Sequence, residues 1–89
     1  MEFEWDSAKR ASNLAKHGID FADAVEAFEA PMLVAVDSRA DYGETRFAGI
    51  GRAAGRVIVV VWTEREDVIR LISARRANAK ERTRYETPE

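Results

Sequence analysis

The chain of 89 residues contains no cysteine and only one histidine, His17. The lack of cysteine excludes disulfides, thiolate nucleophiles and Cys-ligated zinc, and one histidine cannot build a multi-histidine metal site within a single chain. No apolar run approaches the ~18 residues of a membrane span, and the first residues lack the apolar stretch of a signal peptide. We therefore expect residues 1–89 to form one soluble, cytoplasmic, metal-independent domain.

Charge is spread unevenly along the chain, although the formal net charge is only −2. Residues 1–42 hold four basic and nine acidic side chains, a balance of −5, whereas residues 43–89 hold ten basic and seven acidic ones, a balance of +3. Eleven of the fourteen basic residues are arginine, whose guanidinium makes bidentate contacts with phosphate. Composition alone fits a salt-bridged surface, but the basic second half leaves a local nucleic-acid surface open.

The first quarter of the chain predicts a strand and a helix. Residues 2–5 alternate polar and apolar side chains, which is typical of a short strand. Asp6 or Ser7 can cap a helix that runs to about His17, where Gly18 ends it. The polar side of this helix is expected to carry Lys9, Asn13, Lys16 and His17.

The rest of the chain predicts a second helix, four strands and a final helix. The second helix is expected to begin after Asp20 and to end at Pro31. The strands are expected at residues 32–36, 44–52, 56–63 and 67–74, and the last helix at residues 75–85. This order, β-α-α-β-β-β-β-α, predicts an α+β fold in which an antiparallel sheet carries the two N-terminal helices and the C-terminal helix on one face.

The last expected strand and the final helix are rich in arginine. Alternation predicts Val68, Arg70, Ile72 and Ala74 on one face of the strand, and Ile69, Leu71, Ser73 and Arg75 on the other. An arginine such as Arg70 among apolar neighbours needs a carboxylate or phosphate partner if it is buried. In the final helix Arg76, Lys80 and Arg84 would form one basic stripe. That stripe fits either a solvated helix steadied by Glu81–Arg84 pairs or a cationic surface for RNA or an acidic partner.

One carboxylate and several guanidiniums could cleave RNA without a metal. A carboxylate can accept the 2′-OH proton and arginine can stabilise the pentacoordinate phosphorane. Glu44 and Arg46 share a face of their expected strand, and Arg65 lies at the tip of the last hairpin. The alternative is that Glu44 forms purely structural ion pairs with Arg46 or Arg65.

Other conspicuous residues favour structural roles. His17 could act as a general acid, but beside Gly18 it is more often a group that caps helix carbonyls. Trp5 and Trp62 fall on expected strands and are interpreted as core residues. The G-I-G-R segment at residues 49–52 lies within a strand and indicates a bulge or a close approach of another element.

Two sequence blocks resemble the BrnT family of toxins, the toxin halves of type II toxin–antitoxin modules. The first block is W-D-x-x-K-x-x-x-N-x-x-K-H-G-I-x-F at residues 5–21, and the second is I-S-A-R-x-A-x-x-x-E-R-x-x-Y at residues 72–85. Between them, G-E-T-R and G-R-V-I-V-V-V-W-T-E-R keep the order and spacing, so that the resemblance covers residues 3–85.

The resemblance implies a RelE-like ribonuclease fold and toxicity through cleavage of mRNA, which halts translation, with no cofactor. It also implies neutralisation by a BrnA-like antitoxin whose ribbon-helix-helix part binds operator DNA, so that the toxin meets DNA only through the antitoxin. Under this hypothesis the catalytic residues are Glu44 as base and Arg46, Arg65 and Arg75 on the scissile phosphate. The residues expected to hold the RNA strand are Lys9, Lys16, Arg76, Lys80 and Arg82.

A second hypothesis from a different class stays open at the level of sequence. The chain could be a non-catalytic binding module, acting as antitoxin partner and transcriptional co-repressor, whose basic C-terminal helix docks acidic antitoxin segments.

Overall fold

The predicted α+β fold is confirmed by a computed structural model that describes residues 1–39, 41 and 43–87. The elements follow in the order β1 (Glu2–Glu4), α1 (Ser7–His17), α2 (Phe21–Ala24), the 3₁₀ helix η1 (Val25–Glu29), β2 (Leu33–Asp37), β3 (Arg46–Ala53), β4 (Arg56–Arg65), β5 (Val68–Arg76) and α3 (Ala79–Glu86). In this described part, no helix is long and apolar enough to span a bilayer.

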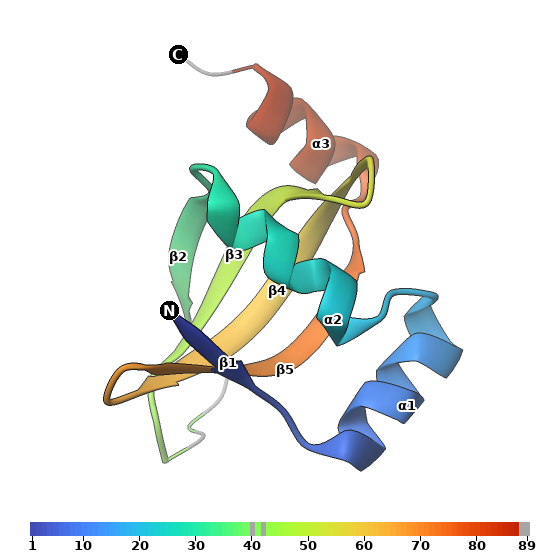
Figure 1. Ribbon diagram of the computed structural model, residues 1–89. Helices are drawn as coiled ribbons and strands as arrows, with labels where there is room; N and C mark the ends of the chain where they lie inside the picture. The colour runs from blue at the N-terminus through green and yellow to red at the C-terminus, as the bar shows by residue number, and fades with distance from the viewer. Residues whose placement is uncertain (40, 42, 88–89) are drawn as a thin grey trace.

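The strands form one mixed sheet in the order β1-β5-β4-β3-β2 (Figure 1). Strands β2 to β5 are the antiparallel meander that the sequence predicts. The expectation of a wholly antiparallel sheet is corrected at one edge, where β1 pairs with β5 in parallel, from Glu2 opposite Val68 to Glu4 opposite Arg70. The alternation of side chains in a three-residue strand does not indicate whether the strand pairs in a parallel or an antiparallel direction. The direction is set by its partner β5, which lies far along the chain.

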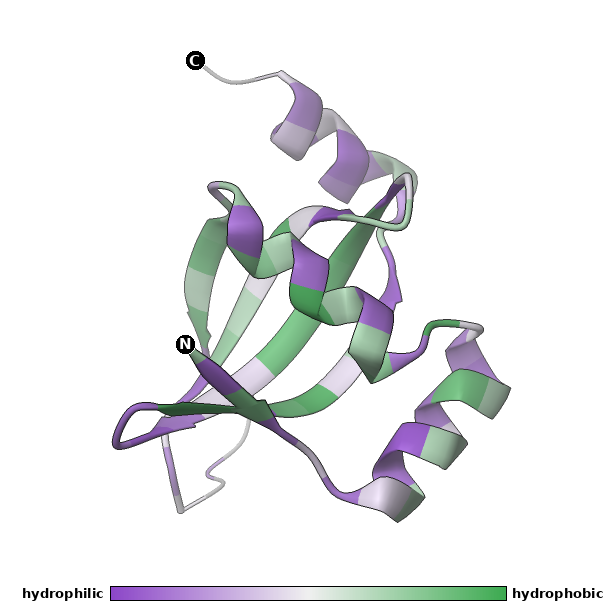
Figure 2. Ribbon diagram, in the orientation of Figure 1, coloured by the Kyte–Doolittle hydropathy of each residue, from purple (hydrophilic) through white to green (hydrophobic). Residues whose placement is uncertain are grey.

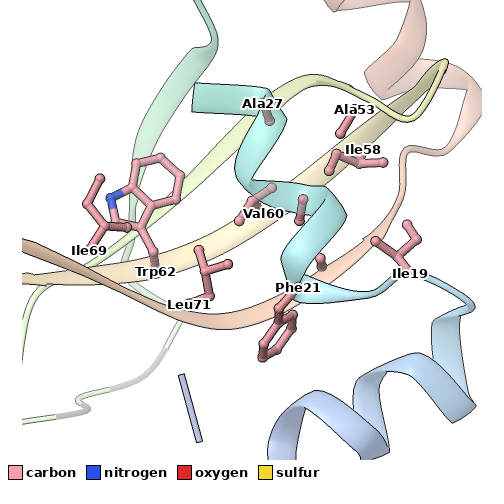
Figure 3. Close-up of a cluster of buried hydrophobic side chains, with 11 residues drawn as sticks. Ile19, Phe21, Ala27, Ala53, Ile58, Val60, Trp62, Ile69 and Leu71 are labelled. Atoms are coloured by element: carbon pink, nitrogen blue, oxygen red, sulfur yellow. The ribbon is translucent and has the colours of Figure 1, made fainter. Parts of the chain in front are cut away.

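The main core lies between the sheet and the segment formed by α2 and η1 (Figure 3). Ile58, Val60 and Trp62 point from β4 toward this segment, and Phe21 is fully buried beneath it. The expected single helix ending at Pro31 is instead one turn of α-helix followed by 3₁₀-helix. The change of winding suits the packing, because residues three apart in a 3₁₀-helix project from the same side.

Two glycines let η1 and the following residues approach β3 closely. A Cβ at Gly49 would lie 2.9 Å from the Trp62 ring, and one at Gly51 would lie 2.7 Å from Cγ of Met32. The close approach that the G-I-G-R segment indicates is therefore confirmed. Trp62 is 4% exposed, as expected of a core residue.

Helix α3 packs on the opposite face of the sheet, which corrects the expectation that all helices share one face. Tyr85 of α3 packs against Ile50 of β3 and against Val57 and Val59 of β4, and these two β4 side chains alternate with those of the main core. α3 itself is largely hydrophilic (Figure 2). It therefore covers only one end of its face and leaves the remainder open.

Strand β5 is longer than expected and contains an irregularity. Val61 pairs with Ser73 while Trp62 pairs with Leu71, so that Ile72 has no partner of its own. The predicted alternation is therefore wrong beyond Leu71: Ala74 joins Leu71 in the main core, and Ser73 turns to the opposite face.

The C-terminal helix starts later than expected. Arg76 still pairs with Ile58 in the sheet, and Asn78 caps α3 through a capping box with Glu81. The predicted stripe of Arg76, Lys80 and Arg84 along one helix is consequently wrong, because Arg76 belongs to β5.

Candidate functional site

A groove of about 670 Å³ occupies the open face of the sheet, on the side that α3 only partly covers. Its floor is apolar and comes from β3 and β4, with Ala48, Ile50, Val59 and Val61. Paired residues on neighbouring strands share a face, so Arg75 lies on this floor beside Val59. The wall residues with polar side chains are His17, Asp37, Ser38, Arg39, Ser73, Glu81 and Arg84.

Arg75 is held in the groove by Glu81. Its Nη1 and Nη2 donate to Oε1 and Oε2 of Glu81 at 2.8 and 2.9 Å, a bidentate pair. The backbone N–H of Asn78 also donates to Oε1 of Glu81 at 2.9 Å. The capping box therefore fixes the carboxylate, and the carboxylate fixes the guanidinium. These hydrogen bonds, chiefly those from Arg75, lower the pKa of Glu81 to about 2.

Further positive charge surrounds this pair. Arg39 is anchored on Asp37, to which its Nε and Nη2 donate at 2.8 and 2.9 Å. Glu81 raises the pKa of Arg75, and the nearby charge of Arg39 opposes that rise. With Arg84 on the α3 wall, the described lining residues place three guanidiniums and His17 with two carboxylates in the groove. The arrangement favours an anionic ligand.

Asn13 fixes the backbone next to Arg75. β1 pairs with β5 only as far as Arg70, so no strand in the described part of the chain lies beside the outer edge of β5 at Ala74. The Asn13 amide takes that place: its Nδ2 donates to the carbonyl of Ala74 at 2.9 Å, and its Oδ1 accepts from the N–H of Ala74 at 3.1 Å. Asn13 is 7% exposed, so its predicted position on the polar side of the first helix is wrong.

The other predicted catalytic residues, Glu44, Arg46 and Arg65, lie near the C-terminal end of β4, away from Arg75. Nη2 of Arg65 donates to Oε1 of Glu44 at 3.1 Å, and Nε of Arg46 lies 3.5 Å from Oε2 of Glu44. Hydrogen bonding from Arg65, with the added charge of Arg46, lowers the pKa of Glu44 below its usual value. The sequence-based ion pairs of Glu44 are thus confirmed.

The four predicted catalytic residues therefore form two groups on one face. Arg46 pairs with Thr63 in the sheet, whereas Arg75 pairs with Val59. Four residues along β4 separate the two positions, about 13 Å at ~3.3 Å per residue. Arg46 alternates in phase with Ala48, so it projects from the same face as the groove floor. The separation is too large for both guanidiniums to contact one phosphate in this arrangement.

The predicted strand-holding residues are spread more widely. Lys9 and Lys16 are exposed on α1, and Lys80 is exposed on α3; none of them lines the groove. Arg76 and Arg82 line a second, smaller pocket beyond α3. Arg70, which needed an anionic partner, has Glu4 of β1, to which its Nη1 donates at 3.0 Å.

The roles of two site residues, Glu81 and Asn13, are not predicted by the sequence. Glu81 is expected to pair with Arg84, but it binds Arg75. The pattern Asn78-x-x-Glu81, which is typical of a capping box, is the signal in the sequence that indicates its position. The role of Asn13 depends on a contact with Ala74, 61 residues away, and has no local signal. His17 lines the groove rather than serving only as the helix end.

The pair of Arg75 and Glu81 predicts a specific pH dependence of stability. Because folding lowers the pKa of Glu81 from 4.5 to about 2, its ionised form stabilises the folded state above pH 4.5, and this contribution is lost as pH falls toward about 2. The E81Q variant lacks the contribution. Over this pH range, we expect the free energy of unfolding of wild type to fall by on the order of 2 kcal/mol more than that of E81Q. This figure includes a reduction for solvent screening, because Arg75 is partly exposed.

Chemical unfolding of both proteins across that pH range measures the difference. Other carboxylates titrate in both proteins and cancel in the comparison. Equal losses of unfolding free energy in wild type and E81Q would contradict the assignment of Glu81 as a carboxylate stabilised by Arg75.

Most of the chain matches one known protein family: a family model described as "Ribonuclease toxin, BrnT, of type II toxin-antitoxin system" covers residues 5–81. A search of curated proteins gives no match. In residues 1–39, 41 and 43–87, no group of three or more histidine and carboxylate side chains is placed to hold a metal ion.

Proposed function

Because the chain belongs to the BrnT family of ribonuclease toxins of type II toxin–antitoxin systems, we propose that it cleaves mRNA in the groove on its open sheet face. The observation that carries this proposal is the placement of Arg75, locked by Glu81, in a groove that His17 also lines. A fixed guanidinium and a histidine are suitable groups for metal-independent cleavage of a phosphodiester.

The proposed reaction is an attack of the ribose 2′-oxygen on the adjacent phosphorus. The 2′-OH loses its proton to a base as the new P–O bond forms, and the bond to the 5′-oxygen breaks as that oxygen gains a proton. The products are a 2′,3′-cyclic phosphate and a 5′-OH end. Arg75 would stabilise the charge on the pentacoordinate phosphorane, and its fixed position means that little reorganisation is needed.

In this proposal His17 exchanges the protons. Histidine is the side chain best suited to accept and donate protons near neutral pH. Glu44 is less suited to be the base, because Arg65 and Arg46 hold its pKa below the usual value, further from neutrality. We assign Glu44 instead to orienting Arg46 and Arg65, which would bind another phosphate of the strand farther along the same face of the sheet.

The exposed basic residues would hold the RNA outside the groove. Lys9 and Lys16 on α1, with Lys80 on α3, add positive charge without competing for the apolar floor. Phosphate contacts of this kind position a strand but carry no base specificity.

The antitoxin partner implied by the family is proposed to be BrnA-like and to reach operator DNA itself. Edge strand β2 offers it a surface, since Leu33, Val34 and Val36 are 44%, 53% and 59% exposed. An unpaired strand edge with exposed apolar side chains is a common place for another chain to bind.

Induced expression in a bacterial host tests the proposed function. Wild type is expected to arrest growth with loss of mRNA, whereas an Arg65→Ala/Arg75→Ala double variant is expected to permit growth while remaining soluble. Co-expression of a BrnA-like antitoxin should restore growth of the wild type. A folded, soluble wild type that causes no arrest would contradict the nuclease proposal and favour the non-catalytic binding module.

A further inference from the structure

A second pocket, of about 330 Å³, lies at the end of the sheet beyond α3 and is surrounded by arginine. The tight turn at Ala54 and Gly55, where φ is 52° and 75°, brings the end of β3 back into β4 and places Arg52 and Arg56 at one side. Arg76 at the end of β5 and Arg82 of α3 complete the set. Four guanidiniums from three strands and a helix therefore converge on one small cavity.

This cluster is poorly neutralised. Among the residues that the structure describes, its lining includes a single carboxylate, Glu86, which Arg52 contacts at 3.3 Å. Both side chains of that pair are about half exposed, at 49% and 51%, and such exposed pairs contribute little. Within the described residues, 1–39, 41 and 43–87, Arg56 and Arg76 form no ion pair.

Two of the four guanidiniums are positioned by contacts within the protein. Nη1 of Arg82 donates to the carbonyl of Ala77 at 3.0 Å, and the Arg52 guanidinium lies 6.0 Å from the centre of the Tyr85 ring. These contacts hold the two guanidinium groups, and each group has five N–H donors, more than these contacts use. Mutual repulsion of the four charges would be relieved by an anion, and planar guanidiniums match phosphate oxygens well.

The position of the pocket relative to the groove indicates which phosphate it would take. Arg75 and Arg76 are consecutive on β5, and alternation sends the first into the groove and the second away from it. On α3, Arg84 lines the groove while Arg82 lines the pocket. Arginine side chains of both β5 and α3 therefore line each of the two cavities.

We propose that this pocket binds a backbone phosphate of the RNA strand whose scissile phosphate lies in the groove, several nucleotides away. The inference rests on the proposed function and adds Arg52 and Arg56 to the RNA-binding surface. A contact of this kind raises affinity for strands long enough to pass α3 and does not depend on base sequence.

Binding of RNA that cannot be cleaved by 2′-oxygen attack tests this. The probes are 2′-O-methyl RNA of about 4 and about 16 nucleotides, the range of site sizes in single-strand binding proteins. For an Arg52→Ala/Arg56→Ala variant we expect the affinity for the long RNA to fall about tenfold and the affinity for the short RNA to fall much less. The salt dependence of log K for the long RNA should weaken by about 0.7 for each lost phosphate contact.

A matched control separates a local contact from net charge. Ala22→Glu with Ala30→Glu also changes the net charge by two units, at exposed positions in α2 and at the end of η1 that do not line the pocket. This control is expected to bind the long RNA almost as well as wild type. An equal loss of affinity in the control would overturn the inference, because it would show a general field effect.

The remaining outcomes also decide the matter. An Arg52→Ala/Arg56→Ala variant that binds the long RNA as wild type does overturns the inference alone, while the proposed groove function stands. A wild type that binds neither RNA overturns both. If the Arg52→Ala/Arg56→Ala variant binds duplex DNA more weakly than wild type but binds RNA equally well, the pocket is a DNA site and the assignment to RNA is overturned.

Discussion

Replacing Arg75 with alanine is expected to slow RNA cleavage by about 10²–10³-fold, the loss seen when one fixed donor to a developing negative charge is removed. The fold holds the Arg75 guanidinium in the groove through two hydrogen bonds to Glu81 at 2.8 and 2.9 Å. Alanine keeps the β-carbon at this position of the floor but removes the charge that would stabilise the phosphorane. The effect should appear in kcat more than in KM, because the contact matters most in the transition state.

Arg70→Ala provides the matched control for this variant. Arg70 also lies on β5 and also pairs with a glutamate, Glu4, at 3.0 Å, but it does not line the groove. Both variants remove an ion pair of a β5 arginine, so both are expected to lose some stability. Only Arg75→Ala should lose cleavage; similar rates in the two variants would contradict a catalytic role for Arg75.

Replacing Asn13 with alanine is expected to lower the free energy of unfolding by about 3 kcal/mol. The substitution leaves the N–H and the carbonyl of Ala74 without their partner at a strand edge that β1 does not reach. Each buried, unsatisfied backbone group costs about 1–3 kcal/mol. For a domain of this size, the loss corresponds to a fall in Tm of roughly 12–24 °C.

Thermal or urea unfolding measures the effect, with Ser12→Ala as a control at the neighbouring exposed position on α1. The control is expected to change stability by less than about 0.5 kcal/mol, as surface substitutions usually do. Asn13→Asp should also be destabilising, because a carboxylate offers no donor to the carbonyls of Ala74 and Ile19. A variant at Asn13 as stable as wild type would show that the amide does not hold this edge.

Local signals in the sequence were sufficient for most of the elements. Asp6 and Gly18 bound α1 as expected, and the apolar run in β4 became a central strand buried on both faces. The interpretation of Trp62 as core and of the G-I-G-R segment as a close approach also held. These features depend on neighbours within a few positions, which alternation and capping rules describe.

The errors arose where pairing between distant segments decides the geometry. Strict alternation cannot anticipate the irregularity at Ile72, because a bulge is a property of two paired strands. The irregularity at Ile72 places Ala74 and Ser73 on faces of the sheet other than those that alternation from Leu71 predicts. The parallel pairing of β1 with β5 likewise depends on residues at opposite ends of the chain.

The same distinction applies to the candidate site. The group around Glu44 was foreseeable, because Arg46 is two residues away and Arg65 follows on the hairpin strand. The pairing of Glu81 with Arg75 can be predicted only when the start of α3 is known. The contact of Asn13 with Ala74 can be predicted only when the position of α1 against β5 is known. The residues were visible in the sequence, but their partners were not.

Cleavage of a defined RNA by the purified chain in excess EDTA, with analysis of the product ends, tests the central claim most directly. The account predicts cleavage that persists without free divalent metal, products with 2′,3′-cyclic phosphate and 5′-OH ends, and no cleavage of 2′-O-methyl RNA or by the Arg75→Ala variant. Cleavage that EDTA abolishes, that leaves 5′-phosphate ends, or that Arg75→Ala performs at the wild-type rate would contradict it.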